Sequence, residues 1–257
     1  KEYPWYQSIV VFSNKIFVID SSVSKVRIHG LQDGRLLYES DRLKSTPMAV
    51  CLINDSEIAV VLKNSVIKIM STHDTPVIRW TRDLRVRGGL DRYHGVVSFD
   101  GDLVVCGVKE NTVCWCIVSS NDRRVVGTIH QICKAKSWSL SYITAKHNII
   151  YISCDFDSPD TGVYAYDVQN PSKYKYSYKH TDLKGPTGIS IDHRASLFVC
   201  NYIPYSCIHH LTSECQLVSI IRWGIPYRPL AIFCDDRRLY VTCWWSNHIT
   251  TYRTHYL

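Results

Sequence analysis

A hydrophobic triplet recurs six times along this chain, and its period constrains the fold more than any other feature. Successive copies lie 42, 45, 47, 47 and 42 residues apart and fill the 257 residues. The copies begin at Ile16, Ile58, Leu103, Ile150, Leu197 and Leu239. A fixed period of about 20 to 50 residues is typical of solenoids and propellers. The chain is therefore expected to be one repeat architecture.

Each triplet sits in the same local pattern, which defines the repeat as a sheet. An apolar run and a polar turn precede it, a loop and a third apolar strand follow it, and five copies add a more polar fourth strand. The connections are only about five residues long, whereas parallel crossovers need a dozen or more, so the strands must be antiparallel. Four antiparallel strands per repeat are typical of a propeller blade.

The sequence thus predicts an all-β fold, a six-bladed β-propeller of four-stranded antiparallel blades, as a single domain over residues 1–257. The predicted blades span residues 1–41, 42–84, 85–133, 134–183, 184–225 and 226–257. The sixth copy lacks an obvious outer strand, because only Thr254 to Leu257 remain after Tyr252. Either those residues or Lys1 to Tyr6 must complete the last blade and hide its edge. The sequence leaves both options open.

The composition limits which partners and which cellular compartment are expected. The chain carries 30 Lys and Arg against 23 Asp and Glu, a net charge of +7, which suits an acidic or nucleic-acid partner if the charge is clustered. Its eleven cysteines form no C-x-x-C pair and mostly occupy apolar strand positions. Unpaired cysteines of this kind favour a reducing compartment, so a cytoplasmic location is expected. No apolar run approaches the roughly 18 residues of a membrane span, so no membrane partner is expected.

The fifth repeat resembles the NHL repeat. Pro186 to Asp192 reads P-x-G-I-x-I-D, and Leu197 to Asn201 reads L-F-V-C-N. The sixth repeat is a looser copy, so the resemblance covers roughly the last 75 residues. The chain is similar to the C-terminal propellers of tripartite-motif (TRIM-NHL) ubiquitin ligases in their divergent invertebrate form. It departs from the repeat at Ala195, where Gly is usual, and at Asn201, where Asp is usual.

The resemblance also implies a function. Such propellers bind RNA or recruit proteins, and the ligase activity of the family resides in RING and B-box zinc modules. This chain has no Cys/His cluster of that kind, so any ligase activity would lie outside it. The chain itself is predicted not to be an enzyme and to need no cofactor or metal ion.

One face of the propeller is the candidate binding site. In a four-stranded blade, the loops between the second and third strands emerge on the same face as the links between blades. These segments combine Lys and Arg with aromatic residues, a mixture used both by single-stranded RNA binders and by protein interfaces. The predicted binding residues are Lys44, Arg85, Arg87, Arg92, Tyr93, Lys134, Lys136, Tyr202, Tyr205, Tyr227, Arg228, Trp244 and Trp245. Either a protein or single-stranded RNA fits this composition, and the domain is expected to be a monomer.

Two alternatives remain open. Six-bladed propellers also serve as calcium-dependent hydrolases or lactonases. In such enzymes a ring of Asp, Asn and Glu residues converges at the central channel. Directly after the six triplets, only Asp20 and Asn201 could act as such ligands, whereas a calcium ion takes six or more oxygens. A secreted carbohydrate-binding propeller would suit the aromatic residues, but the unpaired cysteines oppose it.

Overall fold

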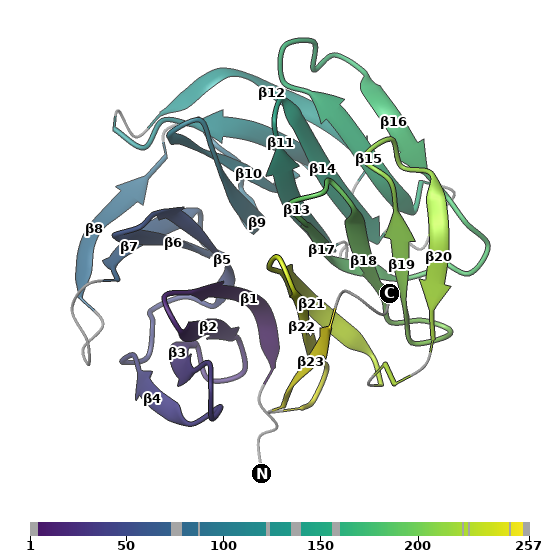
Figure 1. Cartoon of the computed structure of the whole chain (residues 1–257). Helices are drawn as coiled ribbons and strands as arrows, with labels where there is room; N and C mark the ends of the chain where they lie inside the picture. The colour runs from purple at the N-terminus through teal and green to yellow at the C-terminus, as the bar shows by residue number, and fades with distance from the viewer. Residues whose placement is uncertain are drawn as a thin grey trace.

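The structure, a computed structural model, describes residues 5–72, 79–86, 88–121, 124–134, 140–155, 160–222, 224–225, 227–246 and 248–253. In these residues every regular element is a β-strand, and six antiparallel sheets stand around a central axis (Figure 1). This arrangement confirms the predicted all-β, six-bladed propeller. No helix of membrane-spanning length and hydropathy occurs in the described part of the chain.

Five blades have four strands, and the sixth has three in the described residues. Blades 1 to 3 contain β1 (Tyr6–Phe12), β2 (Lys15–Asp20), β3 (Lys25–Gly30), β4 (Leu36–Glu39); β5 (Pro47–Asn54), β6 (Glu57–Leu62), β7 (Val66–Ser71), β8 (Trp80–Arg85); and β9 (Arg92–Phe99), β10 (Asp102–Lys109), β11 (Thr112–Val118), β12 (Val125–Lys134). Blades 4 to 6 contain β13 (Leu140–Lys146), β14 (Ile149–Asp155), β15 (Gly162–Asp167), β16 (Tyr174–Tyr178); β17 (Pro186–Ile191), β18 (Leu197–Asn201), β19 (Cys207–Leu211), β20 (Leu217–Ile221); and β21 (Pro229–Cys234), β22 (Arg238–Cys243), β23 (Ile249–Arg253).

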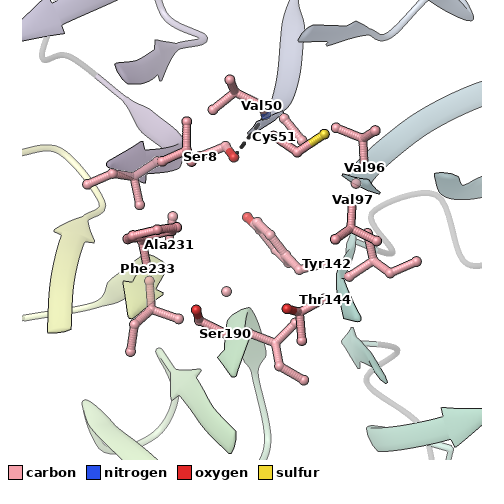
Figure 2. Close-up of a pocket in the computed structure, with 18 of the residues that line it drawn as sticks. Ser8, Val50, Cys51, Val96, Val97, Tyr142, Thr144, Ser190, Ala231 and Phe233 are labelled. Atoms are coloured by element: carbon pink, nitrogen blue, oxygen red, sulfur yellow. Dashed lines mark hydrogen bonds between the residues drawn. The ribbon is translucent and has the colours of Figure 1, made fainter. Parts of the chain in front are cut away.

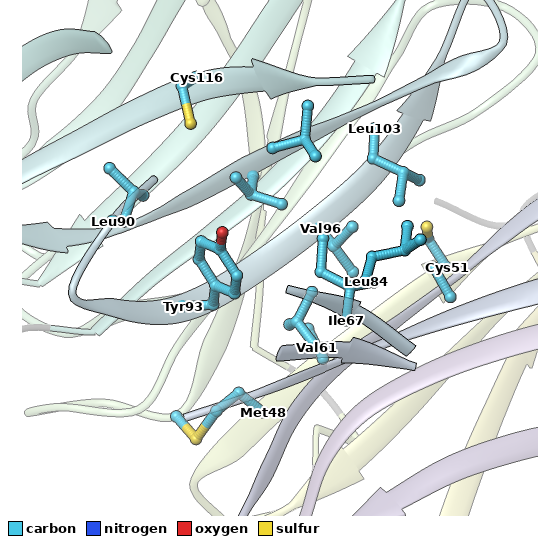
Figure 3. Close-up of a cluster of buried hydrophobic side chains, with 14 of the residues drawn as sticks. Met48, Cys51, Val61, Ile67, Leu84, Leu90, Tyr93, Val96, Leu103 and Cys116 are labelled. Atoms are coloured by element: carbon cyan, nitrogen blue, oxygen red, sulfur yellow. The ribbon is translucent and has the colours of Figure 1, made fainter. Parts of the chain in front are cut away.

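The recurring triplets form the second strand of each blade, and burial explains their composition. In β6, all five residues after Glu57 are buried, and β2 and β14 show the same pattern. A strand covered on both faces needs apolar side chains on both, which produces a continuous apolar run instead of alternation. Apolar clusters fill the spaces between neighbouring blades, and the largest joins blades 2 and 3 (Figure 3).

Small residues let the innermost strands approach one another closely around the axis. A Cβ atom added to Gly188 on β17 would lie 2.6 Å from the Cα of Ala231 on β21. A Cβ atom added to Gly95 on β9 would lie 3.0 Å from Cγ2 of Ile143 on β13. A side chain at position 188 would therefore collide with the backbone of β21, and one at position 95 would require its neighbours to shift.

The ring closes where blade 6 meets blade 1. The Thr242 hydroxyl donates a 2.6 Å hydrogen bond to the carbonyl oxygen of Tyr6, which is 236 residues away in sequence. Tyr6 begins β1, and the main-chain N–H of Trp5 donates to the side chain of Asp20, so both residues belong to blade 1. Residues 1–4 and 254–257, the two candidates for an outer strand of blade 6, lie outside the described residues. Within the described residues, β1 packs against β21 and β22 and so closes the ring.

The strand order defines two faces of the propeller. The face that carries the loops between second and third strands and the links between blades is here named the linker face. The opposite face carries the turns between first and second strands and is named the turn face. The described members of the predicted binding set, apart from Tyr93, lie in or beside segments of the linker face.

Candidate functional site

Aromatic side chains from blades 5, 6 and 1 gather on the linker face. The ring centroid of Trp244 lies 4.5 Å from that of Trp5, 5.9 Å from that of Tyr202 and 6.3 Å from that of Trp245. Three segments supply the cluster: the loop after β18, the link between β20 and β21, and the loop after β22, with Trp5 added from the start of blade 1. The aromatic surface is defined here as Trp5, Tyr202, Tyr205, Tyr227, Arg228, Trp244 and Trp245.

Three rings of this surface face solvent. Tyr205 is 61% exposed, Tyr227 is 71% exposed and Trp245 is 58% exposed. Large aromatic side chains bury well, and leaving several exposed side by side is typical of an interaction surface.

Arg228 lies against two of the three exposed rings. Its guanidinium carbon lies 5.2 Å from the ring centroid of Tyr227 and 5.4 Å from that of Trp245. Its main-chain N–H donates to the hydroxyl of Ser206 at 2.8 Å, and its carbonyl oxygen accepts from the N–H of Trp244 at 2.9 Å. Arg228 and Trp245 both have positive φ angles, 56° and 59°, which residues other than glycine rarely adopt. Such strained conformations persist where surrounding contacts fix them, and they cluster at functional sites.

Tyr202 is held from beneath. Its hydroxyl donates to the Asp155 carboxylate at 3.1 Å, and its main-chain N–H donates to the carbonyl oxygen of Gly185 at 3.0 Å. A Cβ atom at position 185 would lie 2.4 Å from the Tyr202 ring. The absence of a side chain at Gly185 therefore lets this ring lie against the link between blades 4 and 5.

The charges near the aromatic surface are mixed. Arg222 lies with its guanidinium over the ring of Tyr205 and pairs with Asp182 at 2.7 Å. Lys184 is exposed, and the Asp155 carboxylate lies under Tyr202. The sector therefore presents neither a strong positive nor a strong negative field.

Apart from Arg228, the predicted basic residues lie elsewhere on the ring. Lys44 is on the link between blades 1 and 2, Arg85 ends β8 and Lys134 ends β12, and all three are exposed. None of them forms an ion pair with another residue that the structure describes. Arg92 begins β9 and is half-buried. Arg87 and Lys136 lie outside the described residues. The described basic residues other than Arg228 are thus spread over blades 1 to 3, apart from the aromatic surface.

The prediction that Tyr93 belongs to the binding surface is wrong. Tyr93 is fully buried in the cluster between blades 2 and 3, where it packs near Met48 and Leu90 (Figure 3). Burial raises the pKa of its hydroxyl well above the ordinary value. The sequence places Tyr93 in a link, whereas β9 begins one residue earlier, so its side chain is a core residue of the first strand.

Asp20 and Asn201, the two candidate ligands of a calcium-dependent hydrolase, tie loops together. Asp20 is fully buried, accepts from the hydroxyl of Ser22 at 2.6 Å and pairs with Arg27 at 3.0 Å. The Asn201 amide accepts from the N–H of Gly185 at 2.9 Å and donates to two carbonyl oxygens. Their polar atoms are therefore engaged within the protein. Among the described residues, no group of three His, Cys, Asp or Glu residues could hold a metal ion.

Sequence reasoning missed Trp5 and Arg222. Trp5 precedes the first repeat, so its contact with Trp244 depends on closure of the ring, which no local pattern reports. Arg222 follows an outer strand, and only its position over Tyr205 shows that it belongs here. The tandem Trp244 and Trp245 did carry a signal, since adjacent residues of an extended chain point to opposite sides and both cannot enter one core layer.

No family model and no curated protein sequence matches this chain. Solved structures do match it. Virginiamycin B lyase from Staphylococcus aureus has a TM-score of 0.65 and 17% identity, over 100% of this chain and 83% of its own. A structural genomics protein of unknown function from Bacteroides thetaiotaomicron has a TM-score of 0.74 and 10% identity, over 98% of this chain and 70% of its own. A chain of a mitotic checkpoint complex has a TM-score of 0.65 and 11% identity, over 94% of this chain and 73% of its own.

At these identities the likeness establishes the propeller fold alone, and the resemblance to NHL repeats still rests on the fifth and sixth repeats. The prediction that the chain is not an enzyme requires correction. Structures that share this fold over the whole chain include virginiamycin B lyases, which are enzymes. The propeller architecture is therefore compatible with catalysis.

Proposed function

We propose that this chain is a recognition domain that binds a protein partner through the aromatic surface. The observation that carries this proposal is the set of three exposed rings, Tyr205, Tyr227 and Trp245, with Arg228 stacked against two of them. Trp, Tyr and Arg are the residues that dominate binding energy at protein interfaces.

Preorganisation supports the proposal. Arg228 is fixed by two main-chain hydrogen bonds, and Tyr202 is fixed by Asp155 and Gly185. Side chains that are already ordered lose less conformational entropy when a partner binds, so more of the contact energy becomes affinity.

The charges favour a protein over single-stranded RNA. Nucleic-acid binding needs several free cations that follow a phosphate backbone. Here Arg222 is paired with Asp182, Arg228 stacks on aromatic rings, and the exposed lysines of blades 1 to 3 lie on other sectors. The eleven free cysteines favour a reducing compartment, so the proposed partner is cytoplasmic.

A random-peptide display library selected on the immobilised domain tests this function. Peptides that bind the wild-type domain are expected to lose about 30-fold or more in affinity when Tyr227→Ala and Trp245→Ala are combined, as for a hot spot of about 2 kcal/mol. Tyr174→Ala is the matched control, because Tyr174 is also an exposed ring, 42% exposed, on the outer strand β16 of blade 4.

Two results would contradict the proposal. Peptides that bind the double variant as tightly as the wild type would exclude the aromatic surface. A random single-stranded RNA pool that binds tightly at low salt and weakens steeply at higher salt, with no peptide selected, would replace the protein partner with a nucleic acid.

A further inference from the structure

A cavity of about 240 Å³ occupies the centre of the propeller, and the innermost strands of all six blades line it (Figure 2). No charged residue that the structure describes contributes to its wall. Val50, Val97 and Phe233 supply apolar surface, while Ser8, Thr144 and Ser190 supply hydroxyl groups. The cavity is therefore an uncharged, mainly apolar chamber.

One side chain reaches across this chamber. Each innermost strand has one residue that pairs with the last residue of the triplet on the second strand. The six residues that directly precede these partners form one layer around the axis. Five of the six are small, and the exception is a tyrosine. The layer consists of Ser8, Ala49, Gly95, Tyr142, Gly188 and Ala231. The Tyr142 ring points into the space that the five small residues leave open (Figure 2).

The hydroxyl of Tyr142 has no hydrogen-bond partner among the residues that the structure describes, although the side chain is only 6% exposed. Burial raises the pKa of this hydroxyl well above its ordinary value, so it keeps its proton and can donate it. The nearby Ser8 and Ser190 hydroxyls are already used as acceptors, from the N–H groups of Val50 at 3.1 Å and Cys234 at 3.0 Å. A buried donor without a partner is costly, and a ligand acceptor at this place would satisfy it.

We infer that the central chamber binds a small uncharged molecule with a ring-sized apolar body and one hydrogen-bond acceptor, which receives the proton of Tyr142. An ionised ligand would lose its hydration with no opposite charge on the wall to replace it. Apolar cavities of about 150 Å³ in other proteins bind benzene. At about 240 Å³, this chamber has room for a ring with a short polar substituent.

The chamber is separate from the aromatic surface. On each innermost strand, the lining residues run from the layer of Tyr142 toward the turn between the first and second strands, so the chamber lies on the side of the turn face. The aromatic surface lies on the linker face. Binding in the chamber is therefore independent of the proposed protein partner.

Three probes of matched size test the inference: acetophenone, which carries a carbonyl acceptor; ethylbenzene, which lacks it; and benzoate, which is charged. Binding to the purified chain is measured by calorimetry and by ligand-observed NMR. Acetophenone is expected to bind the wild type and to weaken about tenfold with Tyr142→Phe, the usual effect of one lost hydrogen bond. Ethylbenzene is expected to bind both proteins equally, and benzoate is expected not to bind.

Thr144→Val is the matched control, because it removes another hydroxyl from the same wall, and it is expected to leave acetophenone binding unchanged. Tyr142→Phe keeps the ring, and circular dichroism confirms that each variant folds. The inference is overturned if acetophenone binds wild type and Tyr142→Phe with equal affinity, if benzoate binds as well as acetophenone, or if acetophenone does not bind the wild type. Tyr227→Ala with Trp245→Ala is expected to leave acetophenone binding unchanged, which separates this site from the aromatic surface.

Discussion

Two histidines of this propeller, His94 and His209, are buried with little access to solvent. Burial, reinforced by nearby Arg92 and Lys63, lowers the pKa of His94 to about 4. Burial, followed by His180 and Arg222, lowers the pKa of His209 to about 4, and the Tyr178 hydroxyl lies 2.8 Å from its Nδ1 atom. Both imidazoles are therefore neutral in the folded state at pH 7.

Acidification is expected to destabilise the fold through these two groups. Each folded pKa lies below the unfolded value of about 6.5, so the unfolded state binds more protons, and stability falls as the pH drops from 6.5 toward 4. The loss by pH 5 is up to about 2 kcal/mol for each histidine. Urea unfolding at pH 7.5 and pH 5 measures it. His209→Gln, which retains an acceptor for Tyr178, is expected to lessen the difference, and an unchanged difference would show that His209 does not contribute.

Single residues show how far sequence reasoning reaches. The pair Trp244 and Trp245 was expected not to enter one core layer together, because adjacent strand residues point to opposite faces. Trp245 is 58% exposed, whereas Trp244 packs against a core cluster. Tyr93 was placed wrongly, because a shift of one residue in the start of β9 decides whether this side chain lies in a link or in the core. The unpaired hydroxyl of Tyr142 could not be predicted, because its surroundings depend on the sizes of residues on five other strands.

At the scale of elements, burial decides which strands the sequence reveals. The second strands are covered on both faces and were predicted as apolar triplets, and these predictions are confirmed. The outer strand of blade 2, β8, exposes three of its six residues. Outer strands are half exposed and polar, so their hydrophobic pattern is weak. For that reason Arg85 and Lys134, which were expected in loops, end strands instead.

The approach of β17 to β21 gives a test of inner-strand packing. Gly188→Ala is expected to cost about 1 to 3 kcal/mol, since the new Cβ atom meets the backbone of β21 and forces the two strands apart. Chemical denaturation measures this cost. Ala231→Gly removes a methyl group on the facing strand and serves as the control for general sensitivity. If Gly188→Ala were as stable as the wild type, the ring would be looser than the structure indicates.

At the scale of the whole molecule, the period of the triplet was enough to predict the ring and its six blades. The distribution of function around the ring was not predictable. The linker face was expected to mix positive charge with aromatic rings. The exposed rings gather with Arg228 at the seam of blades 5, 6 and 1, whereas Lys44, Arg85 and Lys134 lie on blades 1 to 3. Sequence order places Trp5 and Trp244 at opposite ends of the chain, and only ring closure joins them.

Closure itself can be weakened by one substitution. The Thr242 hydroxyl donates to the carbonyl oxygen of Tyr6 and accepts from the N–H of Ala231 at 3.1 Å. Thr242→Val keeps the shape of the side chain but leaves both backbone groups without this partner, at a cost of about 1 to 3 kcal/mol. Native-state hydrogen exchange is expected to accelerate in β1 and β21 more than in β9 and β10. A uniform acceleration over all blades would show that the seam does not open separately.

Each described sheet is built from one contiguous stretch of sequence, and no described strand of blade 1 enters the sheet of blade 6. The chain order of the blades is therefore not essential to any sheet. A circularly permuted chain that joins the two termini and begins at the link before blade 3 would keep every described strand pairing. Folding follows the same logic: each blade forms from neighbours within about 45 residues, and the seam, which joins the most distant residues, carries the largest loop-closure entropy and assembles last.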